Sequence, residues 1–502
     1  MAICSRLALR LLSGFSILKH ILFIEFWNCS PHLETALELA KRHIDDGDQV
    51  SFYFCGHDTP FINGISVHPE DCGLFRKLPE VRGVELINST RLHFHPRVTL
   101  PKVNVSIPTY FESLNDLINF KYKTFQAGIG VASSLVSDTQ NSRPDLKIHH
   151  DRIIPMITSS VSVYEFTKSV LESTKADLIY IFNGRFCNHR AVMCAAQEHG
   201  IEILYHERGA NKFHYNVMPA VPHDLSYLQQ RIKSRWDEFG KDPAARELAT
   251  AYFTDLRKGV VHGWVSYTGN QRKNALPAID PTRRIISYFS SSEDEYVSVG
   301  DLIKFTGWNS QFDAVNDLIQ ICQGDSRLQL FIRLHPHKRY KSAEDQNRWL
   351  ALAEHENVTV ISFDSDVDSY ALIETSDVVI TAGSTVGLEA TLLGRPSIAV
   401  GPSAYSELGV TYLPNSKKEL EKLLFSELKP LPIEGVLAYG HYMMTFGTKF
   451  KHFEPETLFK GKFLGVDLHE MPLNRKRWLR FKNLLFKPLR ALKKVLGVNQ
   501  SR

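Results

Sequence analysis

Apolar and polar positions along the chain form two series of strand and helix patterns. The first series opens with the apolar run His20–Trp27, continues with a helical pattern over His32–Asp45 and returns to a strand pattern at Gln49–Cys55. A strand, a helix and a second strand in this order are typical of a parallel sheet. We expect Ser30 to cap the helix and Pro31 to occupy its first turn.

After a mixed stretch over Asp58–Asp151, where we predict one helix at Phe111–Val136, the first series resumes. Its further elements are helix, strand, helix and strand, at Val161–Ser173, Ala176–Phe182, His189–His199 and Glu202–Tyr205. Polar groups, Asn183–Arg185 and His206–Gly209, directly follow the two strands. Because parallel sheets bind ligands at the carboxyl ends of their strands, we expect these groups at a site.

The second series contains five strands and four helices and follows a helical stretch at His223–Ala275. The strand patterns are Arg284–Phe289, Leu328–Leu334, Val358–Phe363, Asp377–Thr381 and Pro396–Val400. The helical patterns between them are Trp308–Cys322, Ala343–His355, Tyr370–Thr375 and Thr385–Leu393. The predicted fold class is α/β, with two Rossmann-like domains facing a cleft. We expect domains at 1–222 and 281–430, a helical connector at 223–280 and a helical extension with a basic tail at 431–502.

Composition narrows the class of protein. The 502 residues are 43% hydrophobic and 23% charged, as in ordinary globular proteins, and the length suits two or three domains. Ten of the 59 Lys and Arg residues lie in 474–502, which has no Asp or Glu, so 49 basic and 55 acidic residues remain elsewhere, a balance of −6. This charge distribution argues against a nucleic-acid partner. The seven scattered cysteines predict neither a disulfide framework nor a zinc site.

The strongest chemical motif is Ile380–Ala390, with the sequence ITAGSTVGLEA. Gly383 allows a ligand to approach the backbone closely, and Ser384 and Thr385 begin a helix whose free N–H groups favour an anion. We therefore predict a phosphate cradle here, with Glu389 accepting hydrogen bonds from ribose hydroxyls. The alternative is an ordinary N-cap on a core helix.

Basic and imidazole groups follow another strand of the same domain. The sequence RLHPHKR at Arg333–Arg339 places several of them where a departing phosphate needs neutralisation. His335 is the favoured ligand contact because Pro336 rigidifies its turn, and Arg333 is a second candidate. A solvated basic loop is the alternative. Ser290 and Ser291 follow the first strand of this domain and are candidates for binding donor phosphate or sugar, or part of a hydroxyl-rich loop.

The His-Pro turn, the Ser-Thr helix start, Gly387–Ala390, the Gly394-x-Pro396 pair and the sequence GPSAY at 401–405 together resemble the bacterial capsule polysaccharide biosynthesis family. That family includes GT-B glycosyltransferases that use CMP-activated Kdo, and the motifs are similar to the CMP-binding motifs of bacterial sialyltransferases. The resemblance covers about Arg284–Tyr412. It implies that His335, Ser384 and Thr385 contact the CMP moiety, that the donor is a nucleotide-sugar, with a CMP-sugar favoured, and that the acceptor is a surface polysaccharide or glycolipid.

The first domain offers candidates for the acceptor side. Glu207 and His206 lie at a strand end and suit a general base or nucleophile. Asn183, Arg185 and Arg190 are candidates for holding an anionic acceptor or the sugar carboxylate. A structural ion pair between Glu207 and its neighbour Arg208 is the alternative.

Other motifs are set aside. Asp364-Ser365-Asp366 matches a D-x-D metal motif, but Asp366 or Asp368 precedes a helix and suits an N-cap, so no metal is predicted. Ala127–Gly130 lacks the strand and third glycine of a dinucleotide fingerprint, and no Walker A sequence is present. We expect no cofactor, with the nucleotide-sugar as substrate.

The C-terminal stretch Arg475–Leu496 mixes nine basic residues with large apolar ones and is interrupted by Pro488. It suits two short amphipathic pieces that dock on an anionic membrane surface, or else a helix packed on the protein body. Met1–His20 does not fit a signal peptide, since Arg6 and Arg10 interrupt it. We expect a cytoplasmic protein, peripheral on the inner face of the cell membrane.

These observations favour a metal-independent GT-B glycosyltransferase. Catalysis would rest on His335, Ser384 and Thr385 at the departing phosphate, and on Glu207 or His206 at the acceptor. A sugar-nucleotide epimerase of the same architecture and a non-catalytic scaffold in a polysaccharide assembly complex are the two alternatives.

Overall fold

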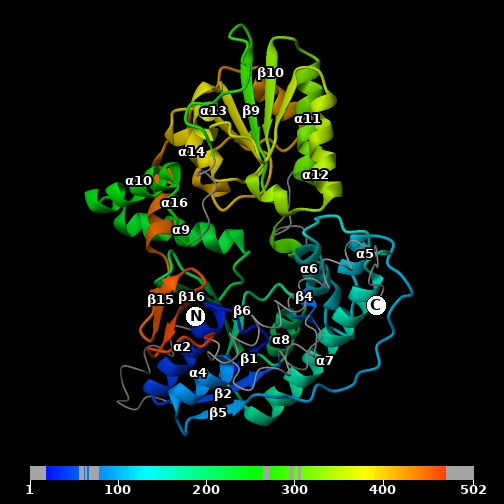
Figure 1. The fold of residues 1–502 in the computed structure, drawn as a ribbon, viewed down its shortest axis with the longest axis vertical. Helices are drawn as coiled ribbons and strands as arrows, with labels where there is room; N and C mark the ends of the chain where they lie inside the picture. Colours follow the sequence, from blue (N-terminus) through cyan, green and yellow to red (C-terminus); the bar gives the residue numbers. More distant parts are fainter. Residues whose placement is uncertain are drawn as a thin grey trace, which may run out of the picture.

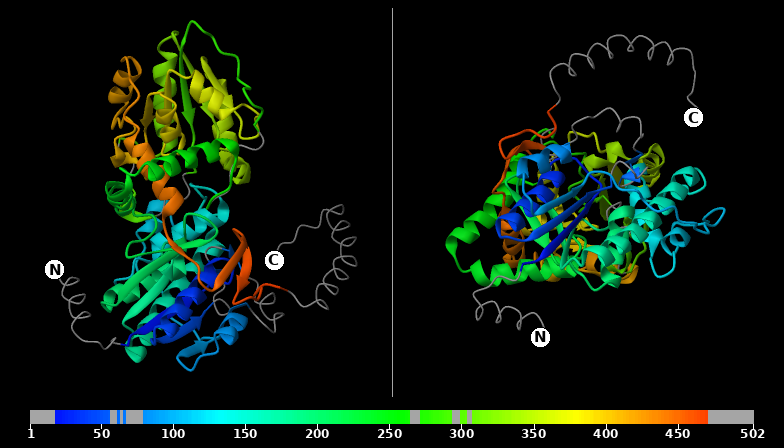
Figure 2. Two further views of the ribbon diagram at one scale, coloured as in Figure 1. Left: turned by 90° about the vertical axis from the view of Figure 1, so that its left-hand side faces the viewer. Right: turned by 90° about the horizontal axis from the view of Figure 1, so that it is seen from below.

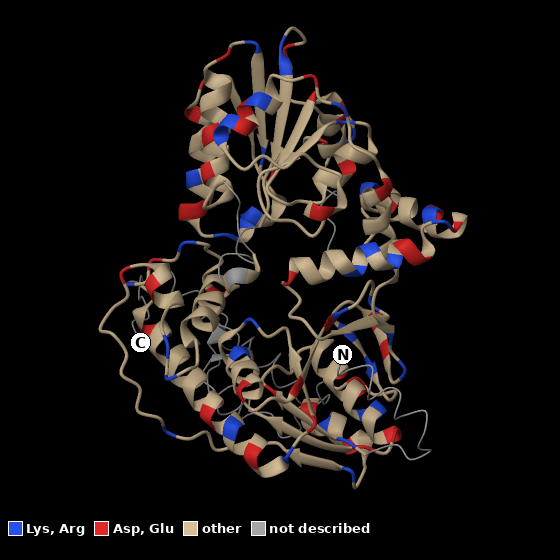
Figure 3. Ribbon diagram, turned by 180° about the vertical axis from the view of Figure 1, so that it is seen from behind, with Lys and Arg blue, Asp and Glu red and all other residues tan. Residues whose placement is uncertain are grey.

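The computed structural model describes residues 18–55, 61–62, 65–66, 79–263, 271–292, 299–303 and 307–470, and shows two α/β lobes joined by helices (Figure 1). The predicted amphipathic stretch Arg475–Leu496 lies outside the described residues. No helix in the described ranges is long and apolar enough to cross a membrane. Basic and acidic residues are interspersed over the helices of both lobes (Figure 3).

The first lobe is built on a seven-stranded sheet in the order β14-β8-β7-β6-β1-β2-β5. Strands β7, β6, β1, β2 and β5 are parallel, whereas β8 and β14 are antiparallel additions at one edge. The bounds are β1 His20–Glu25, β2 Gln49–Phe54, β5 Leu92–His95, β6 Leu178–Phe182, β7 Glu202–Arg208, β8 His214–Met218 and β14 Thr448–Lys449. A separate short hairpin is formed by β3 Phe61–Ile62 and β4 Ile65–Ser66.

The helices of this lobe cover both faces of its sheet and bury an apolar core on each. Their bounds are α2 His32–Asp45, α4 Pro79–Ile87, α5 Leu114–Ile118, α6 Ala127–Thr139, α7 His150–Thr174 and α8 Cys187–Glu198. The connecting helices are α9 Leu225–Phe239 and α10 Pro243–Lys258, which pack with α16 Glu434–Thr445. Tyr252, Phe253 and Tyr439 are buried where they meet.

The second lobe is built on a five-stranded parallel sheet in the order β11-β10-β9-β12-β13. Its strands are β9 Arg284–Phe289, β10 Leu328–Arg333, β11 Val358–Ile361, β12 Val378–Thr381 and β13 Ser397–Ala399. Its helices are α11 Gln311–Gln323, α12 Ala343–Leu350, α13 Ser369–Thr375, α14 Val386–Leu392 and α15 Lys417–Leu424. Short 3₁₀ turns lie at Gly300–Leu302, Pro336–Tyr340, Ala351–Glu354 and Ser406–Leu408.

Both sheets share one topology, which confirms the predicted fold class. The parallel strands of each run in the order third, second, first, fourth, fifth, the Rossmann-like arrangement. The strand order therefore reverses between β1 and β6 in the first lobe and between β9 and β12 in the second. Ligands of such sheets bind beyond the carboxyl ends of strands at this switch point.

Polar contacts join the lobes beside these carboxyl ends. Arg143 donates to the Ser310 hydroxyl at 2.9 Å, and the Lys341 ammonium donates to Gln140 Oε1 at 3.2 Å. Ser310 lies between β9 and α11, and Lys341 lies between β10 and α12. The carboxyl edge of the second sheet is therefore turned toward the first lobe.

The first sheet is turned the same way. Arg185, which follows β6, donates to the Ser137 hydroxyl at 3.3 Å. Ser137 lies in the last turn of α6, next to Gln140, which caps that helix and contacts the second lobe. Arg185, beyond the carboxyl end of β6, thus lies beside the end of α6 that contacts the second lobe.

Several predicted elements need correction. Ser30 does not cap α2, whose N-cap is Pro31 without a side-chain hydrogen bond. The helix expected over Phe111–Val136 is broken into α5 and α6, because the backbones of Tyr122 and Phe125 bond to each other in a turn. Gly128 then starts α6 against the backbone of α5, where a side-chain carbon would lie 1.7 Å from the Leu117 carbonyl oxygen.

The helical extension predicted after residue 431 is wrong beyond α16. The chain returns to the first lobe, where β14 joins the sheet beside β8, and β15 Phe453–Thr457 pairs with β16 Lys460–Phe463. This C-terminal hairpin lies against α2 (Figure 2). Short strands of mixed polarity carry little periodic pattern, which explains why the sequence did not indicate them.

A buried carboxylate holds the returning segment. Glu38 of α2 has no exposed side-chain surface and accepts backbone N–H groups of Lys451, His452 and Phe453 at 2.8, 2.7 and 3.2 Å. Arg42 pairs with the same carboxylate at 2.7 Å. A group from the middle of a helix therefore fixes a segment more than 400 residues later in sequence.

We predict that Glu38→Ala lowers the free energy of unfolding by about 3 kcal/mol, because it leaves buried N–H groups and Arg42 without their acceptor. Urea denaturation at pH 7 measures the change. Glu421→Ala, on the exposed surface of α15, is the control and is expected to cost less than about 0.5 kcal/mol. Equal losses in the two variants would contradict the assigned role of Glu38.

Candidate functional site

The His-Pro turn of the second lobe presents His335 in a defined chemical state. Its backbone N–H donates to the Ser290 hydroxyl at 2.9 Å, and its Nδ1 accepts the backbone N–H of His337 at 3.1 Å. Burial, with His337 and Lys338 nearby, lowers the pKa of His335 to about 4. The ring is therefore neutral at pH 7, and because Nδ1 is an acceptor, the proton lies on Nε2.

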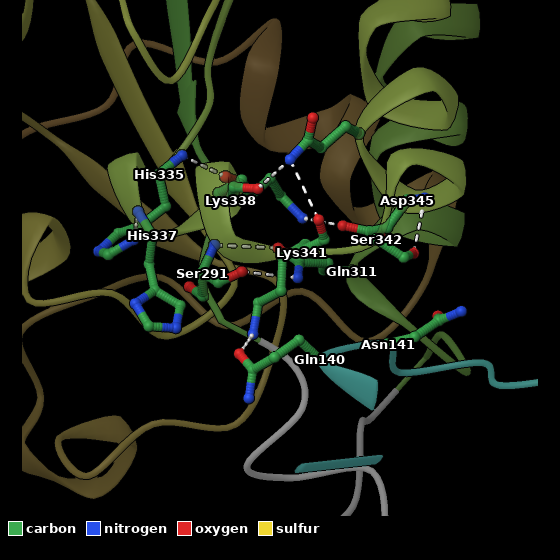
Figure 4. A network of polar contacts seen from close by, with 12 residues as sticks. Gln140, Asn141, Ser291, Gln311, His335, His337, Lys338, Lys341, Ser342 and Asp345 are labelled. Carbon is green, nitrogen blue, oxygen red and sulfur yellow. Dashed lines mark hydrogen bonds and ion pairs between the residues drawn. The ribbon is translucent and has the colours of Figure 1, made fainter. Parts of the chain in front are cut away.

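Cations surround this neutral donor. Lys338 pairs with Asp345 at 3.2 Å and lies over the Trp349 ring at 4.4 Å, while Lys341 reaches Gln140 of the first lobe (Figure 4). Lys338 and Lys341 are both buried. The turn thus combines a neutral hydrogen-bond donor with nearby positive charge, which suits a phosphate.

Arg333 does not join this group, contrary to the prediction. Its side chain is 3% exposed, and its guanidinium donates to the carbonyl oxygens of Ser362 and Ser365, the latter at 3.1 Å. Burial lowers the pKa of Arg333 to about 10. Arg333 anchors the loop between β11 and α13, so we withdraw it as a phosphate ligand.

Ser290 and Ser291 also lie behind the surface. Ser290 is 2% exposed and supports His335, while the backbone of Ser291 exchanges hydrogen bonds of 3.0 and 2.9 Å with the Gln311 side chain. The two hydroxyls are therefore not placed to contact a donor, contrary to the prediction. Ser290 positions the His-Pro turn, and Ser291 fixes the first strand's loop to α11.

Ser384 and Thr385 directly precede α14, where the sequence predicted the start of a helix. Ser384 and Thr385 are both partly exposed, and Thr385 donates to Glu389 at 3.0 Å. Glu389 is buried, its pKa is raised by burial, and Tyr370 is a second hydrogen-bond partner. A ribose contact by Glu389 does not fit this position, so the predicted role is replaced by orientation of Thr385.

We expected Gly383 to let a ligand approach the backbone, but a glycine is needed there because the protein's own chain lies close to it. Its φ is +112°, and a side-chain carbon there would lie 2.2 Å from the carbonyl oxygen of Pro402. The close approach is therefore made by the protein's own backbone. This contact sets the turn that presents Ser384.

In the first lobe, Glu207 lies within β7, which extends to Arg208 beyond the predicted strand end at Tyr205. Its carboxylate accepts Asn183 Nδ2 at 2.9 Å and the Arg208 backbone N–H at 3.1 Å, and one oxygen lies 3.9 Å from His32 Nδ1. Its side chain is 25% exposed. Glu207 is therefore held in place and accessible. The Asn183 amide donates to Glu207 and is not available there to hold an acceptor.

His206 does not share that access. Its side chain has no exposed surface, and its Nε2 lies 3.3 Å from a carboxylate oxygen of Glu25, which is also buried. We therefore withdraw His206 as a group that touches an acceptor and assign the pair to the support beneath Glu207. Glu25 and His32 were not identified from the sequence, since only β1 pairing beside β6 brings them to this point.

The two predicted arginines lie near the start of α8, Arg185 just before the N-cap residue Phe186 and Arg190 in the first turn. Arg185 contacts Ser137 and lies over the Phe186 ring at 4.5 Å. Arg190 is partly buried, which lowers its pKa. The anion-holding role remains a prediction for both arginines.

His189 is buried among aromatic rings between these arginines. Among the described residues neither ring nitrogen has a hydrogen-bond partner, and burial lowers the pKa of His189 to about 3. An unfolded chain binds this proton near pH 6.5, whereas the folded chain resists it, so the free energy of unfolding falls as pH drops below about 6.5.

We predict that His189→Leu removes part of this pH dependence, retaining roughly 2 kcal/mol more of its pH 7 stability at pH 4.5 than the wild type does. Urea denaturation at the two pH values measures the difference. The exposed His355→Leu is the control and should leave the acid loss unchanged. An unchanged pH dependence in His189→Leu would show that His189 titrates normally in the folded protein.

The described residues contain no group of three or more His, Cys, Asp or Glu side chains that could hold a metal ion. Asp368 caps α13 by accepting the backbone N–H groups of Tyr370 and Ala371 at 2.9 and 3.3 Å. The N-cap alternative to a metal motif is thereby confirmed for this residue.

A comparison with family models tests the resemblance to capsule polysaccharide biosynthesis proteins. Residues 301–423 match the model described as capsule polysaccharide biosynthesis protein. The resemblance to that family is confirmed. The matched segment includes the His-Pro turn and the Ser-Thr helix start, and so contains His335, Ser384 and Thr385.

No curated protein matches the sequence. Among solved structures, the β-Kdo 2,4-transferase KpsC of Thermosulfurimonas dismutans is similar at 16% identity, over 53% of this chain and 79% of that one, with a TM-score of 0.35. A UDP-N-acetylglucosamine 2-epimerase, putatively assigned, from Listeria monocytogenes is similar at 12% identity over 87% and 92%, with a TM-score of 0.26. Likenesses this low assign neither activity nor substrate.

Proposed function

We propose that the protein is a GT-B glycosyltransferase that moves a sugar from a nucleotide-sugar donor to a surface polysaccharide or glycolipid. The observation that carries the proposal is the pairing of a phosphate-suited group on one lobe with a held, accessible carboxylate on the other. His335 lies beyond β10, and Glu207 lies at the end of β7. Both are at sheet edges turned toward the interface between the lobes.

In the proposed reaction, the bond between the anomeric carbon and the donor phosphate oxygen breaks as an acceptor hydroxyl attacks that carbon. Nε2–H of His335 donates to the departing phosphate, and Ser384 and Thr385 help to hold it. Glu207 takes the proton of the attacking hydroxyl, oriented by Asn183 and the Arg208 N–H. These residues supply charge stabilisation and base catalysis, and the proposal includes neither a metal nor a cofactor.

The family resemblance supports a CMP-sugar with a Kdo-like sugar as the donor. The second lobe would bind the nucleotide and the first lobe the acceptor. We also propose that the protein acts in the cytoplasm, peripheral on the inner membrane face, through the basic and apolar residues of 475–496.

The donor is tested by thermal unfolding with CMP, CDP, UDP and GDP. A nucleotide at a hundred times its dissociation constant should stabilise the fold by about 2.7 kcal/mol. A shift with CMP alone supports the proposed donor. A shift with UDP or GDP alone would overturn the choice of CMP, and no shift with any nucleotide would favour the scaffold.

The reaction class is tested by following a CMP-sugar with and without a polysaccharide acceptor. Transfer that requires the acceptor supports the glycosyltransferase. Conversion of the sugar in the absence of any acceptor would instead identify an epimerase.

A further inference from the structure

The loop that follows β1 carries a partly exposed tryptophan close to the candidate base. β1 ends at Glu25 and α2 begins at His32, so the loop leaves the carboxyl edge of the sheet at the switch point between β1 and β6. Trp27 and Asn28 are both partly exposed, whereas Phe26 before them is fully buried. The loop therefore presents one large aromatic side chain and one amide where ligands of such sheets bind.

The indole ring of Trp27 is supported from one side. The His32 ring stacks on it with centres 5.4 Å apart and planes 24° from parallel, and the Phe182 ring meets it at 5.3 Å and 70°. His32 and Phe182 also contact each other, with ring centres 4.2 Å apart. Two rings this close together lie on the same side of the indole, so neither of them covers its opposite face.

The polar groups of the same two loop residues are available to a ligand. Neither the indole N–H of Trp27 nor the side-chain amide of Asn28 bonds to any residue in the described ranges, and neither residue is buried. An indole N–H that is shut away from water normally has a hydrogen-bond partner. Both groups therefore face solvent, beside an aromatic face that is also open.

The rings that support Trp27 also flank the candidate base. His32 Nδ1 lies 3.9 Å from a Glu207 oxygen, and Phe182 directly precedes Asn183, which donates to Glu207 at 2.9 Å. The indole and the His32 ring stand between the open face and the Glu207 carboxylate. A sugar on the open face is therefore not the unit that reacts at Glu207, but it fits a further unit of the same acceptor chain.

We propose that Trp27 and Asn28 form a subsite for a neutral pyranose unit of the acceptor, behind the unit that is glycosylated. The apolar C–H face of the pyranose would pack on the indole, and the indole N–H and the Asn28 amide would bind its hydroxyl groups. A neutral sugar fits because the loop from Phe26 to Pro31 contains no charged side chain. The assignment rests on the proposed function and deepens it, since it makes the acceptor a chain of more than one sugar.

The test is ligand-observed NMR on the full chain without nucleotide. Saturation transfer is measured to methyl β-D-galactopyranoside, whose ring has a continuous apolar C–H face, and in parallel to its anionic counterpart, the methyl β-D-galacturonide. We expect stronger transfer to the galactoside. Trp27→Ala should weaken galactoside binding about threefold to tenfold, because the stacked ring is lost. Trp27→Phe should weaken it less, since a smaller ring still packs on His32 and Phe182.

Asn28→Ala is a second variant that leaves the ring packing intact, and it should weaken galactoside binding about threefold to tenfold through the lost hydrogen bonds. Trp236→Ala is the matched control. Trp236 is also partly exposed, but it lies on α9 and packs with the connecting helices. This control should bind the galactoside as the wild type does.

No transfer to the galactoside by the wild type, or equal effects of Trp27→Ala and Trp236→Ala, would overturn the subsite. Stronger transfer to the galacturonide would overturn the choice of a neutral sugar. Because the assay contains no nucleotide, its outcome is independent of the donor test. Galactoside binding without any nucleotide shift would keep the subsite and reject the proposed transfer, whereas a nucleotide shift without galactoside binding would reject the subsite alone.

Discussion

Replacing Glu207 with glutamine should reduce turnover by roughly 10²–10⁴-fold, the range expected when a general base is lost. The single oxygen of glutamine can accept from either Asn183 or the Arg208 N–H, which bond to different carboxylate oxygens of Glu207, and the backbone pairing of β7 with β8 should keep the strand end in place. Nucleotide binding should be unchanged, because Glu207 belongs to the lobe opposite the proposed nucleotide site. Initial rates of sugar transfer and nucleotide thermal shifts measure the two effects.

Glu202→Gln is the matched control, since Glu202 begins the same strand and is exposed. It should leave turnover within about twofold. If Glu207→Gln kept a third or more of wild-type turnover, the carboxylate would not act as the base. The acceptor side of the reaction would then need another residue.

His335→Ala should lower kcat/KM by about 10²–10³-fold, as when one donor to a developing negative charge is removed. The variant should also lose most of the thermal shift with CMP. The physical reason is the loss of the Nε2–H donor, which the neutral ring keeps at pH 7 because the pKa of His335 lies at about 4.

His337→Ala separates this effect from disturbance of the turn. The backbone N–H that binds His335 Nδ1 remains in that variant, so His335 should stay oriented and CMP should bind as before. A full CMP shift in His335→Ala would contradict the assigned phosphate contact. Equal loss in both variants would show that the turn as a whole, rather than the His335 ring, binds the nucleotide.

The sequence allowed the parallel strands to be located because strands buried on both faces are continuous apolar runs. Arg284–Phe289 has the bounds that were predicted, and α2 does as well. Pairing over long sequence distances was not predictable. The contact of Glu38 with Lys451 spans 413 positions, and the strands beside it are too short and polar to form a pattern.

The candidate site was predicted in outline, and side-chain direction accounts for most of the errors. Arg333, Ser290 and Glu389 lie at the expected ends of strands or on the expected helix, but their side chains point into the protein and hold loops or other side chains. Composition at a strand end does not specify which residues turn inward. His335 was identified, whereas its tautomer depends on a backbone N–H that only the folded turn supplies.

The return of the C-terminal segment also determines when the first lobe can be completed during synthesis. Its sheet lacks β14, and Glu38 lacks its backbone donors, until about residue 453 has left the ribosome. Domains generally fold in order from the N-terminus, but here the earlier lobe must wait for residues made after the later one. A fragment ending near residue 222 would consequently expose the α2 surface that the hairpin covers, and expression of the isolated lobe calls for a fused 446–470 segment.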